Sequence, residues 1–162
     1  MGWNSWNVWG PAVDAEKLRD AALWLEKSGL AAHGFQYVVI DDAWSGKRNA
    51  AGEMMPNEKF PDMRALADAV HARGLKLGIY SSPGPKTCEG FEGSLGHELQ
   101  DAATYARWGV DFLKYDWCSY EEVAKDRSLH EFQKPYLLMR DALAKVDRDI
   151  VYWLCQYGYG EG

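Results

Sequence analysis

The sequence of 162 residues lacks any cluster of basic residues, because its 18 lysines and arginines are outnumbered by 24 acidic residues and leave a net charge of −6. This balance argues against nucleic acid and anionic membranes as partners. No apolar run is long enough to span a bilayer. Residues 1–6 also lack the charged and apolar regions of a signal peptide. We therefore expect neither nucleic acid nor membrane as a partner.

Cysteine is scarce, with only Cys88, Cys118 and Cys155 in the chain. Three widely spaced cysteines are too few and too scattered for a zinc ribbon. An odd number also means that one thiol is free or that its partner lies elsewhere. Apart from the adjacent carboxylates Asp41 and Asp42, no group of residues has the spacing of metal ligands. We predict no bound metal and no cofactor.

The chain does have many apolar residues, 47% in all, which is enough for one domain with a real core. Short apolar runs alternate with helical patterns, and this order is typical of βα units around a parallel sheet. The expected strands are 37–40, 75–79, 110–115 and 150–154, preceded by a first strand and its loop within residues 2–8. The expected helices are 14–29, 61–74, 99–109 and 135–146, with Pro135 in the first turn of the last one. Residues 45–60 and 81–93 are expected to form long loops.

Polar and aromatic residues gather directly after each expected strand: Trp6, Asp41 and Asp42, Tyr80, Asp116, and Gln156. In parallel α/β folds the ligand lies at the carboxyl ends of the strands. The first turn, residues 3–6, has no glycine pattern for a phosphate, which argues against a doubly wound sheet. We therefore expect a (β/α)8 TIM barrel. A complete barrel needs about 250 residues, so residues 1–162 are expected to be the N-terminal portion of one such domain, truncated to five strands and four helices, with no second domain.

The stretch 112–118 reads as a buried strand that ends in a carboxylate. Alternate side chains share a face, so Phe112, Lys114 and Asp116 are expected on one side of the sheet. A nearby cation favours an ionised carboxylate, and Lys114 is expected to hold Asp116 as the anion. A desolvated anion that faces a pocket suits a carboxylate nucleophile. A Lys–Asp pair that caps the strand for structural reasons is the alternative.

Several of these motifs together resemble glycoside hydrolase family 27, the family of α-galactosidases and α-N-acetylgalactosaminidases. The matching pieces, in order, are MGWNSWN at the start, YVVIDDAW at 37–44, LKLGIYSSPGPKTCEGFEGS at 75–94, YARWGVDFLKYDWC at 105–118 and WLCQYG at 153–158. Together they cover the whole chain. The resemblance implies a barrel enzyme that cleaves α-galactosides.

The resemblance also implies roles for the polar residues. Asp116 matches the catalytic nucleophile, and Lys114 matches a contact to a substrate hydroxyl. Asp41 and Asp42 match a carboxylate pair that hydrogen-bonds the sugar. This fits retaining hydrolysis, in which one carboxylate forms a covalent glycosyl-enzyme and a second carboxyl group protonates the leaving oxygen. A metal site is the alternative for the Asp41–Asp42 pair.

Other positions carry over in the same way. Trp6 and Tyr80 match aromatic wall residues of the sugar pocket, with core packing as the alternative. Cys88 and Cys118 match a disulfide that links the third and fourth βα loops, with two free thiols as the alternative. Gln156 lies on the loop that contacts the C2 substituent of the sugar, where bulky side chains favour a free hydroxyl. The cysteine pair and the family suggest an extracellular, periplasmic or lysosome-like compartment.

One feature of the family is missing from the sequence. The acid/base aspartate of the family follows the sixth strand, and it is expected beyond Gly162. Without that residue, the chain could be a non-catalytic galactose-binding half-barrel and not part of an α-galactosidase. Two further alternatives to an α-galactosidase are a β-L-arabinopyranosidase or an α-N-acetylgalactosaminidase of the same family, and a metal-binding protein. The sequence makes no prediction of the oligomeric state.

Overall fold

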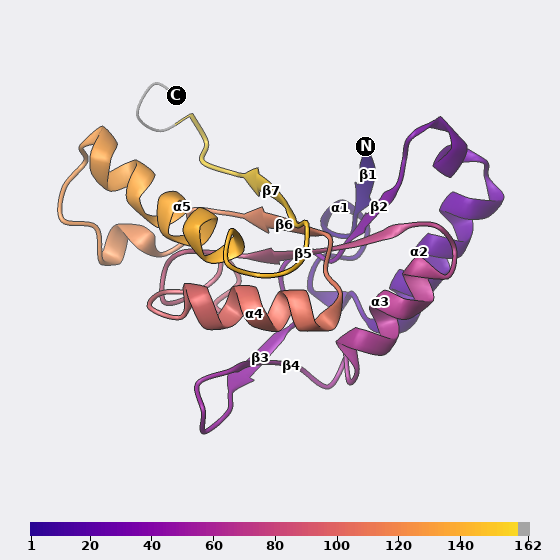
Figure 1. Ribbon diagram of the computed structural model, residues 1–162, viewed down its shortest axis with the longest axis horizontal. Helices are drawn as coiled ribbons and strands as arrows, with labels where there is room; N and C mark the ends of the chain where they lie inside the picture. Colours follow the sequence, from indigo (N-terminus) through magenta and orange to yellow (C-terminus); the bar gives the residue numbers. More distant parts are fainter. Residues whose placement is uncertain (159–162) are drawn as a thin grey trace.

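The computed structural model describes residues 1–158 as a curved sheet of five parallel strands with helices along its outer side (Figure 1). The sheet order β1-β2-β5-β6-β7 follows the chain, so β1 and β7 are the edges. This arrangement is the five-stranded part of an α/β barrel and confirms the predicted fold class. The strands are β1 (Gly2–Asn4), β2 (Tyr37–Val39), β5 (Lys76–Ser81), β6 (Phe112–Tyr115) and β7 (Val151–Leu154).

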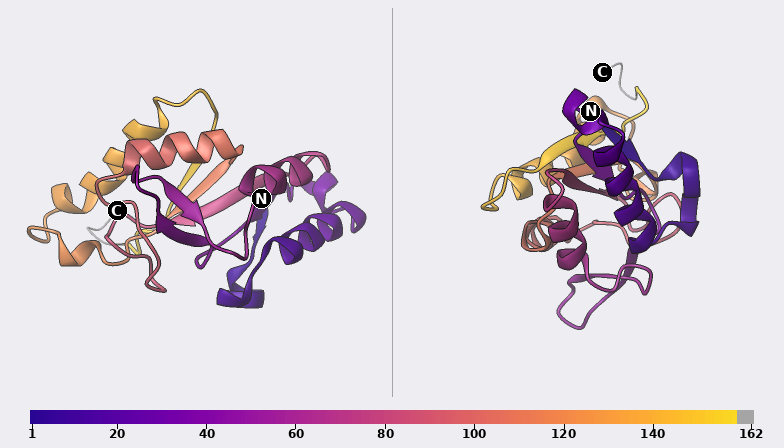
Figure 2. Two further views of the ribbon diagram at one scale, coloured as in Figure 1. Left: turned by 90° about the horizontal axis from the view of Figure 1, so that it is seen from below. Right: turned by 90° about the vertical axis from the view of Figure 1, so that its right-hand side faces the viewer.

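Four long helices connect the strands and follow the outer side of the sheet (Figure 2). They are α2 (Ala15–Lys27), α3 (Met63–His71), α4 (Glu98–Trp108) and α5 (Leu129–Leu143). Two of them begin at aspartate caps: Asp14 accepts from the backbone N–H of Lys17, and Asp62 accepts from that of Ala65. Shorter elements are α1 (Trp6–Trp9) and the 3₁₀ turns Gly10–Ala12, Leu30–His33 and Tyr120–Glu122. No helix within residues 1–158 is long and apolar enough to cross a membrane.

The start of α5 differs from the expectation. The helix begins at Leu129, and Pro135 lies inside it and not in its first turn. The reason is an N-cap, since the hydroxyl of Ser128 accepts from the backbone N–H of Glu131 at 3.2 Å. Pro135 removes one hydrogen bond within the helix, but it is buried against the core. The sequence signal for this start is the capping residue Ser128, whereas Pro135 suggested a start six residues later than Leu129.

Residues 45–60 are not a plain loop. They contain an antiparallel hairpin of β3 (Ser45–Arg48) and β4 (Met54–Pro56). The hairpin is anchored by Arg48, whose guanidinium makes two hydrogen bonds of 2.7 and 2.8 Å to the carboxylate of Asp101 on α4. The side chain of Asp101 is fully buried. Asn49 closes its turn locally, since its side-chain oxygen accepts from the backbone N–H groups of Ala51 and Glu53 at 2.9 and 3.0 Å, and Arg48 then joins the hairpin to α4.

The two faces of the sheet differ in burial. Leu113 and Tyr115 on β6 point to the helices and are 0% exposed. The alternate residue Phe112 faces the concave side, where its ring centroid lies 5.3 Å from that of Tyr37 and 5.9 Å from that of Trp153. The predicted alternation along this strand is therefore correct. It delivers the polar residues that follow the strand to the open rim of the sheet.

Candidate active site

Three aspartates lie at the carboxyl ends of β2 and β6, and all three are buried. Asp41 is 3% exposed, Asp42 is 2% exposed and Asp116 is 3% exposed. Buried carboxylates are costly unless they are hydrogen-bonded, so their partners decide what each can do. The parallel sheet brings residues that are far apart in the sequence to this one rim, as the spacing after the strands predicted.

Asp41 has the largest set of partners. The amide of Asn4 and the ammonium group of Lys114 both donate to its Oδ2, at 2.6 and 2.8 Å. Its backbone N–H donates to the hydroxyl of Ser5 at 3.0 Å. Asn4 and Ser5 were not among the predicted site residues. The signal that could have found them is their place at the carboxyl end of β1, where Asn4 is the last strand residue and Ser5 follows it.

The expectation that Lys114 holds Asp116 as an anion is wrong. Among residues 1–158, the ion pair of Lys114 is with Asp41. Lys114 pairs with Tyr80 in the sheet register, and its Nζ lies 5.1 Å from the centroid of the Tyr80 ring. The long side chain thus leans across β5 over an aromatic face, which attracts a cation, and reaches the end of β2.

Asp42 turns away from Asp41 towards the neighbouring loops. Its Oδ1 accepts from the backbone N–H of Ala43 at 2.7 Å, and its Oδ2 accepts from that of Glu89 at 3.0 Å. Ala43 has a φ of 75°, a left-handed conformation that is uncommon for a residue with a side chain. Burial raises the pKa of Asp42 above its ordinary value of 3.8, and the charge of Asp41 acts in the same direction. The two side chains thus have different protein partners, and the backbone N–H of Asp42 donates to the Oδ1 of Asp41 at 2.9 Å.

Asp116 follows β6 and is fixed at both its backbone and its carboxylate. Its N–H donates to the carbonyl of Ser81 at 3.0 Å, which continues the sheet ladder by one residue. The N–H of Trp117 and the hydroxyl of Tyr157 both donate to its Oδ1, at 2.8 and 2.5 Å. Burial and the adjacent carboxylate of Asp116 raise the pKa of Tyr157. Tyr157 therefore stays a hydrogen-bond donor that orients the carboxylate.

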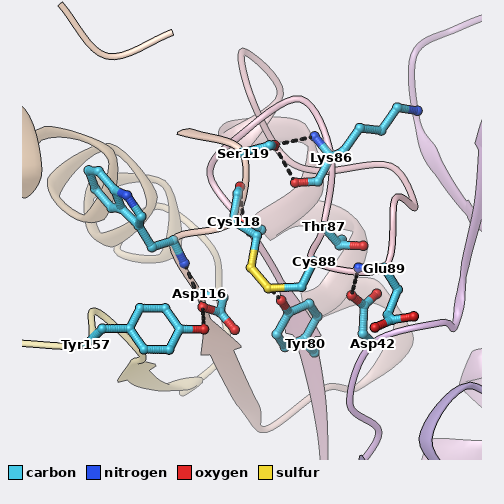
Figure 3. The surroundings of a disulfide bond; sticks show 12 residues. Asp42, Tyr80, Lys86, Thr87, Cys88, Glu89, Asp116, Cys118, Ser119 and Tyr157 are labelled. Carbon is cyan, nitrogen blue, oxygen red and sulfur yellow. Dashed lines mark hydrogen bonds between the residues drawn. A yellow bond between two sulfur atoms is a disulfide. The ribbon is translucent and has the colours of Figure 1, made fainter. Parts of the chain in front are cut away.

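Tyr80 and a disulfide form the wall between Asp116 and Asp42 (Figure 3). The predicted bond between Cys88 and Cys118 is present, with Cα atoms 5.0 Å apart. The hydroxyl of Tyr80 lies 3.6 Å from the Sγ of Cys118. Burial, and then the negative charges of Asp116 and Asp42, raise the pKa of Tyr80. The phenol therefore stays neutral at the rim.

The two remaining predicted residues lie further out. Trp6 begins α1, is partly exposed, and donates its backbone N–H to the Oδ1 of Asn4 at 2.9 Å. Gln156 lines a cavity of about 330 Å³ beside α5, together with Leu129 and Leu137. The next residue, Tyr157, is the one that contacts Asp116. The structure therefore places Trp6 next to the partners of Asp41 and places Gln156 towards the helix side of the rim.

The rim as a whole can bind a polyhydroxylated ligand and attack it. A cavity of about 710 Å³ is lined by residues of the β6 loop, by Phe132 of α5 and by Tyr157, and its lining does not include Asp116, Asp41 or Lys114. Carboxylates and the ammonium of Lys114 accept from and donate to hydroxyl groups. Asp116 supplies an oriented carboxylate at the rim, which is the group that a glycosidase uses as nucleophile or general acid.

Comparisons with known proteins identify the family of this chain. A family model described as "Alpha galactosidase A" matches residues 1–160. An α-galactosidase A from Cellvibrio japonicus is 47% identical over 160 residues, which are 98% of this chain and 38% of that protein. The chain thus spans about two fifths of the length of that curated relative.

Solved structures agree with the sequence match. The crystal structure of α-galactosidase I from Mortierella vinacea has a TM-score of 0.92 and 42% identity, over 96% of this chain and 39% of the other. The structure of an α-galactosidase from Saccharomyces cerevisiae with raffinose has a TM-score of 0.94 and 37% identity, over 98% of this chain and 35% of the other.

Proposed function

The chain belongs to the α-galactosidase family whose model it matches, and we propose that the protein carrying it is a retaining glycoside hydrolase that removes terminal α-linked galactose from oligosaccharides or glycoconjugates. The relative from Cellvibrio japonicus is named an α-galactosidase, and the yeast structure was determined with raffinose. Both support an α-galactoside saccharide as the substrate. In this proposal residues 1–162 are the N-terminal portion of one barrel domain.

The observation that carries the proposal is the placement of Asp116, a carboxylate that is 3% exposed at the carboxyl end of β6 and oriented by two donors on one oxygen. In the proposed reaction the carboxylate attacks the anomeric carbon and forms a covalent glycosyl-aspartate, while the bond to the leaving oxygen breaks. Water then releases the sugar. Two displacements at the same carbon retain its configuration.

A second carboxyl group must protonate the leaving oxygen and later activate water. We place it in the part of the relatives' barrel that this chain does not span, because the chain covers 38% of the Cellvibrio japonicus protein. Asp41 is already bound by the ammonium of Lys114 and the amide of Asn4, and we assign it to sugar binding. In a retaining enzyme this second group lies about 5–5.5 Å from the nucleophile.

The other residues of the rim hold the sugar in this proposal. Asp41 and Asp42 accept hydrogen bonds from neighbouring hydroxyls of the galactose ring, and Lys114 donates to one of them. Lys114 and Asp41 already form an ion pair of 2.8 Å, so they would meet the sugar as one preorganised unit. Trp6 and Tyr80 supply apolar walls for the ring. The loop after β7, which carries Gln156, is proposed to face the C2 substituent, while the side chain of Gln156 lines the cavity beside α5.

The test combines turnover with labelling in the protein that carries this chain. We expect hydrolysis of p-nitrophenyl α-galactoside, and stoichiometric labelling of the peptide that contains Asp116 by a mechanism-based fluorogalactoside, read by mass spectrometry. The p-nitrophenyl N-acetylgalactosaminide and β-L-arabinopyranoside serve as competitors for the assignment of the sugar. Label on a different carboxylate would overturn the role of Asp116. Faster hydrolysis of either competitor would overturn the choice of galactose.

A further inference from the structure

Two sulfur atoms and one carboxylate meet at the wall of the site. The Sγ atoms of Cys88 and Cys118 and a carboxylate oxygen of Asp116 all lie within 4.8 Å of one another. In the oxidised protein the two sulfurs are bonded to each other, and the trio is a disulfide beside a carboxylate (Figure 3). Cys88 is exposed, so a reductant can reach this bond.

We propose that, when this disulfide is reduced, Cys88, Cys118 and Asp116 bind a thiophilic divalent cation such as Zn²⁺ and so occupy Asp116. Zn²⁺ takes thiolate sulfur at about 2.3 Å and carboxylate oxygen at about 2.0–2.2 Å, usually with four ligands. Two thiolates select for such a cation over Mg²⁺ or Ca²⁺. Water would complete the coordination, and the neutral phenol of Tyr80, which lies 3.6 Å from the Sγ of Cys118, would stand beside the metal.

The trio stays assembled without the S–S bond because other contacts hold its two loops together. The hydroxyl of Ser82 donates to the carbonyl of Cys118 at 2.6 Å. The hydroxyl of Ser119 donates to the carbonyl of Lys86 at 2.6 Å and accepts from the N–H of Lys86 at 2.9 Å. Gly84 packs so closely that a Cβ there would lie 2.5 Å from the carbonyl oxygen of Cys118. Reduction therefore breaks only one of several links between the two loops.

The charge at this point also favours a cation. Among residues 1–158, no lysine or arginine forms an ion pair with Asp116, since Lys114 is bound to Asp41. Asp116 is nonetheless 3% exposed. A buried carboxylate without a cationic partner, next to two sulfurs that become anionic on metal binding, attracts a divalent cation.

The chemistry balances in two steps. A phosphine reductant and one water convert the disulfide into two thiols, and the phosphine leaves as its oxide. The cation then displaces the two thiol protons and forms two metal–thiolate bonds, while the carboxylate of Asp116 adds a third ligand without losing a proton. Disulfide and metal exclude each other, and a bound metal excludes nucleophilic attack by Asp116. The metal site stands independently of the proposed hydrolase activity.

The experiment titrates Cd²⁺ into the full chain under anaerobic conditions after the phosphine has been removed. The Cys155→Ser background eliminates the third thiol. We expect one Cd²⁺ per chain, with thiolate-to-cadmium charge-transfer absorption in the ultraviolet, in the reduced protein and none in the oxidised protein. Cys88→Ser and Cys118→Ser should each abolish the absorption change expected for a two-thiolate site.

Asp116→Asn is the decisive variant, because reduced thiols alone can bind Cd²⁺ even in an unfolded chain. Loss of outer-shell partners of metals already weakens binding about 10–100-fold, so loss of this ligand should weaken Cd²⁺ binding by at least about tenfold. Asp42→Asn is the matched control, since Asp42 is a buried carboxylate outside the trio, and it should change the affinity less than about threefold. Equal affinity in Asp116→Asn and the parent, or binding to the oxidised protein, would overturn the site.

Discussion

The two ends of β6 each carry an aspartate, and the comparison shows how surroundings decide a role. Before the strand, Asp111 accepts from the N–H of Leu77 at 2.9 Å and from Arg148 at 2.5 Å, and it lies 2.7 Å from the Nε2 of His71. Structural donors and cations thus occupy both of its oxygens. After the strand, Asp116 has neutral donors on one oxygen. Under the proposed function, the same residue type is structural at one end of the strand and catalytic at the other, a division that is general for barrels.

The largest effect is expected for Asp116→Asn in the protein that carries the chain. We expect kcat on p-nitrophenyl α-galactoside to fall by about 10⁴-fold or more, because loss of a nucleophile removes the covalent route. The free energy of unfolding should stay the same or rise, since residues kept for function are often costly to stability. Denaturant unfolding and steady-state kinetics measure the two effects. Activity within about tenfold of the parent would contradict the comparison.

A second test removes the cation at the carboxyl end. Lys114→Met keeps the apolar stem but removes the ammonium that binds Asp41, so kcat/KM should fall by about 10–100-fold, the range expected for a lost charged hydrogen bond. The matched control is Lys76→Met, because Lys76 is exposed at the amino end of the adjacent strand β5. It should leave kcat/KM within about twofold. Similar losses in both variants would show that Lys114 acts through general charge alone.

A third test removes the carboxylate of Asp111 at the amino end of β6. Asp111→Ala leaves Arg148 and His71 without their carboxylate, and we expect the free energy of unfolding to fall by about 2–4 kcal/mol. Asp141→Ala is the control, since Asp141 forms an exposed ion pair with Arg140 and its side chain is 57% exposed. Exposed pairs contribute about 0–1 kcal/mol. Urea unfolding measures the free energy of unfolding of both variants. An equal decrease in the two would contradict a structural role for Asp111.

The smallest effect concerns pH. Burial raises the pKa of Asp42 above its ordinary value of 3.8. Between that value and the raised pKa, the folded state keeps a proton that the unfolded chain has lost, so the free energy of unfolding falls as pH rises. Asp42→Asn lacks this titration. Relative to the parent, the variant should therefore gain stability with rising pH until the raised pKa is passed. A difference that is constant with pH in urea unfolding would contradict this.

Much of the fold followed from local patterns. The alternation of apolar runs and helical stripes predicted all five strands of the sheet and four helices, and the residues after the strands predicted which side chains meet at the rim. These features depend on periodicity and caps, which act within one element. The start of α5 was predicted wrongly from Pro135. The helix begins earlier, because the N-cap at Ser128 outweighs the one helical hydrogen bond that Pro135 removes.

The sequence by itself thus determined the order of the elements and the set of polar residues at the rim. Only the tertiary structure decided which of these residues bind each other. Lys114 bonds to Asp41 across β5 and not to Asp116 two residues away. The hairpin of β3 and β4 is held against α4 because Arg48 meets the buried Asp101. Both choices depend on distances between segments that are far apart in the chain, and the energy of an ion pair depends on those distances and on burial.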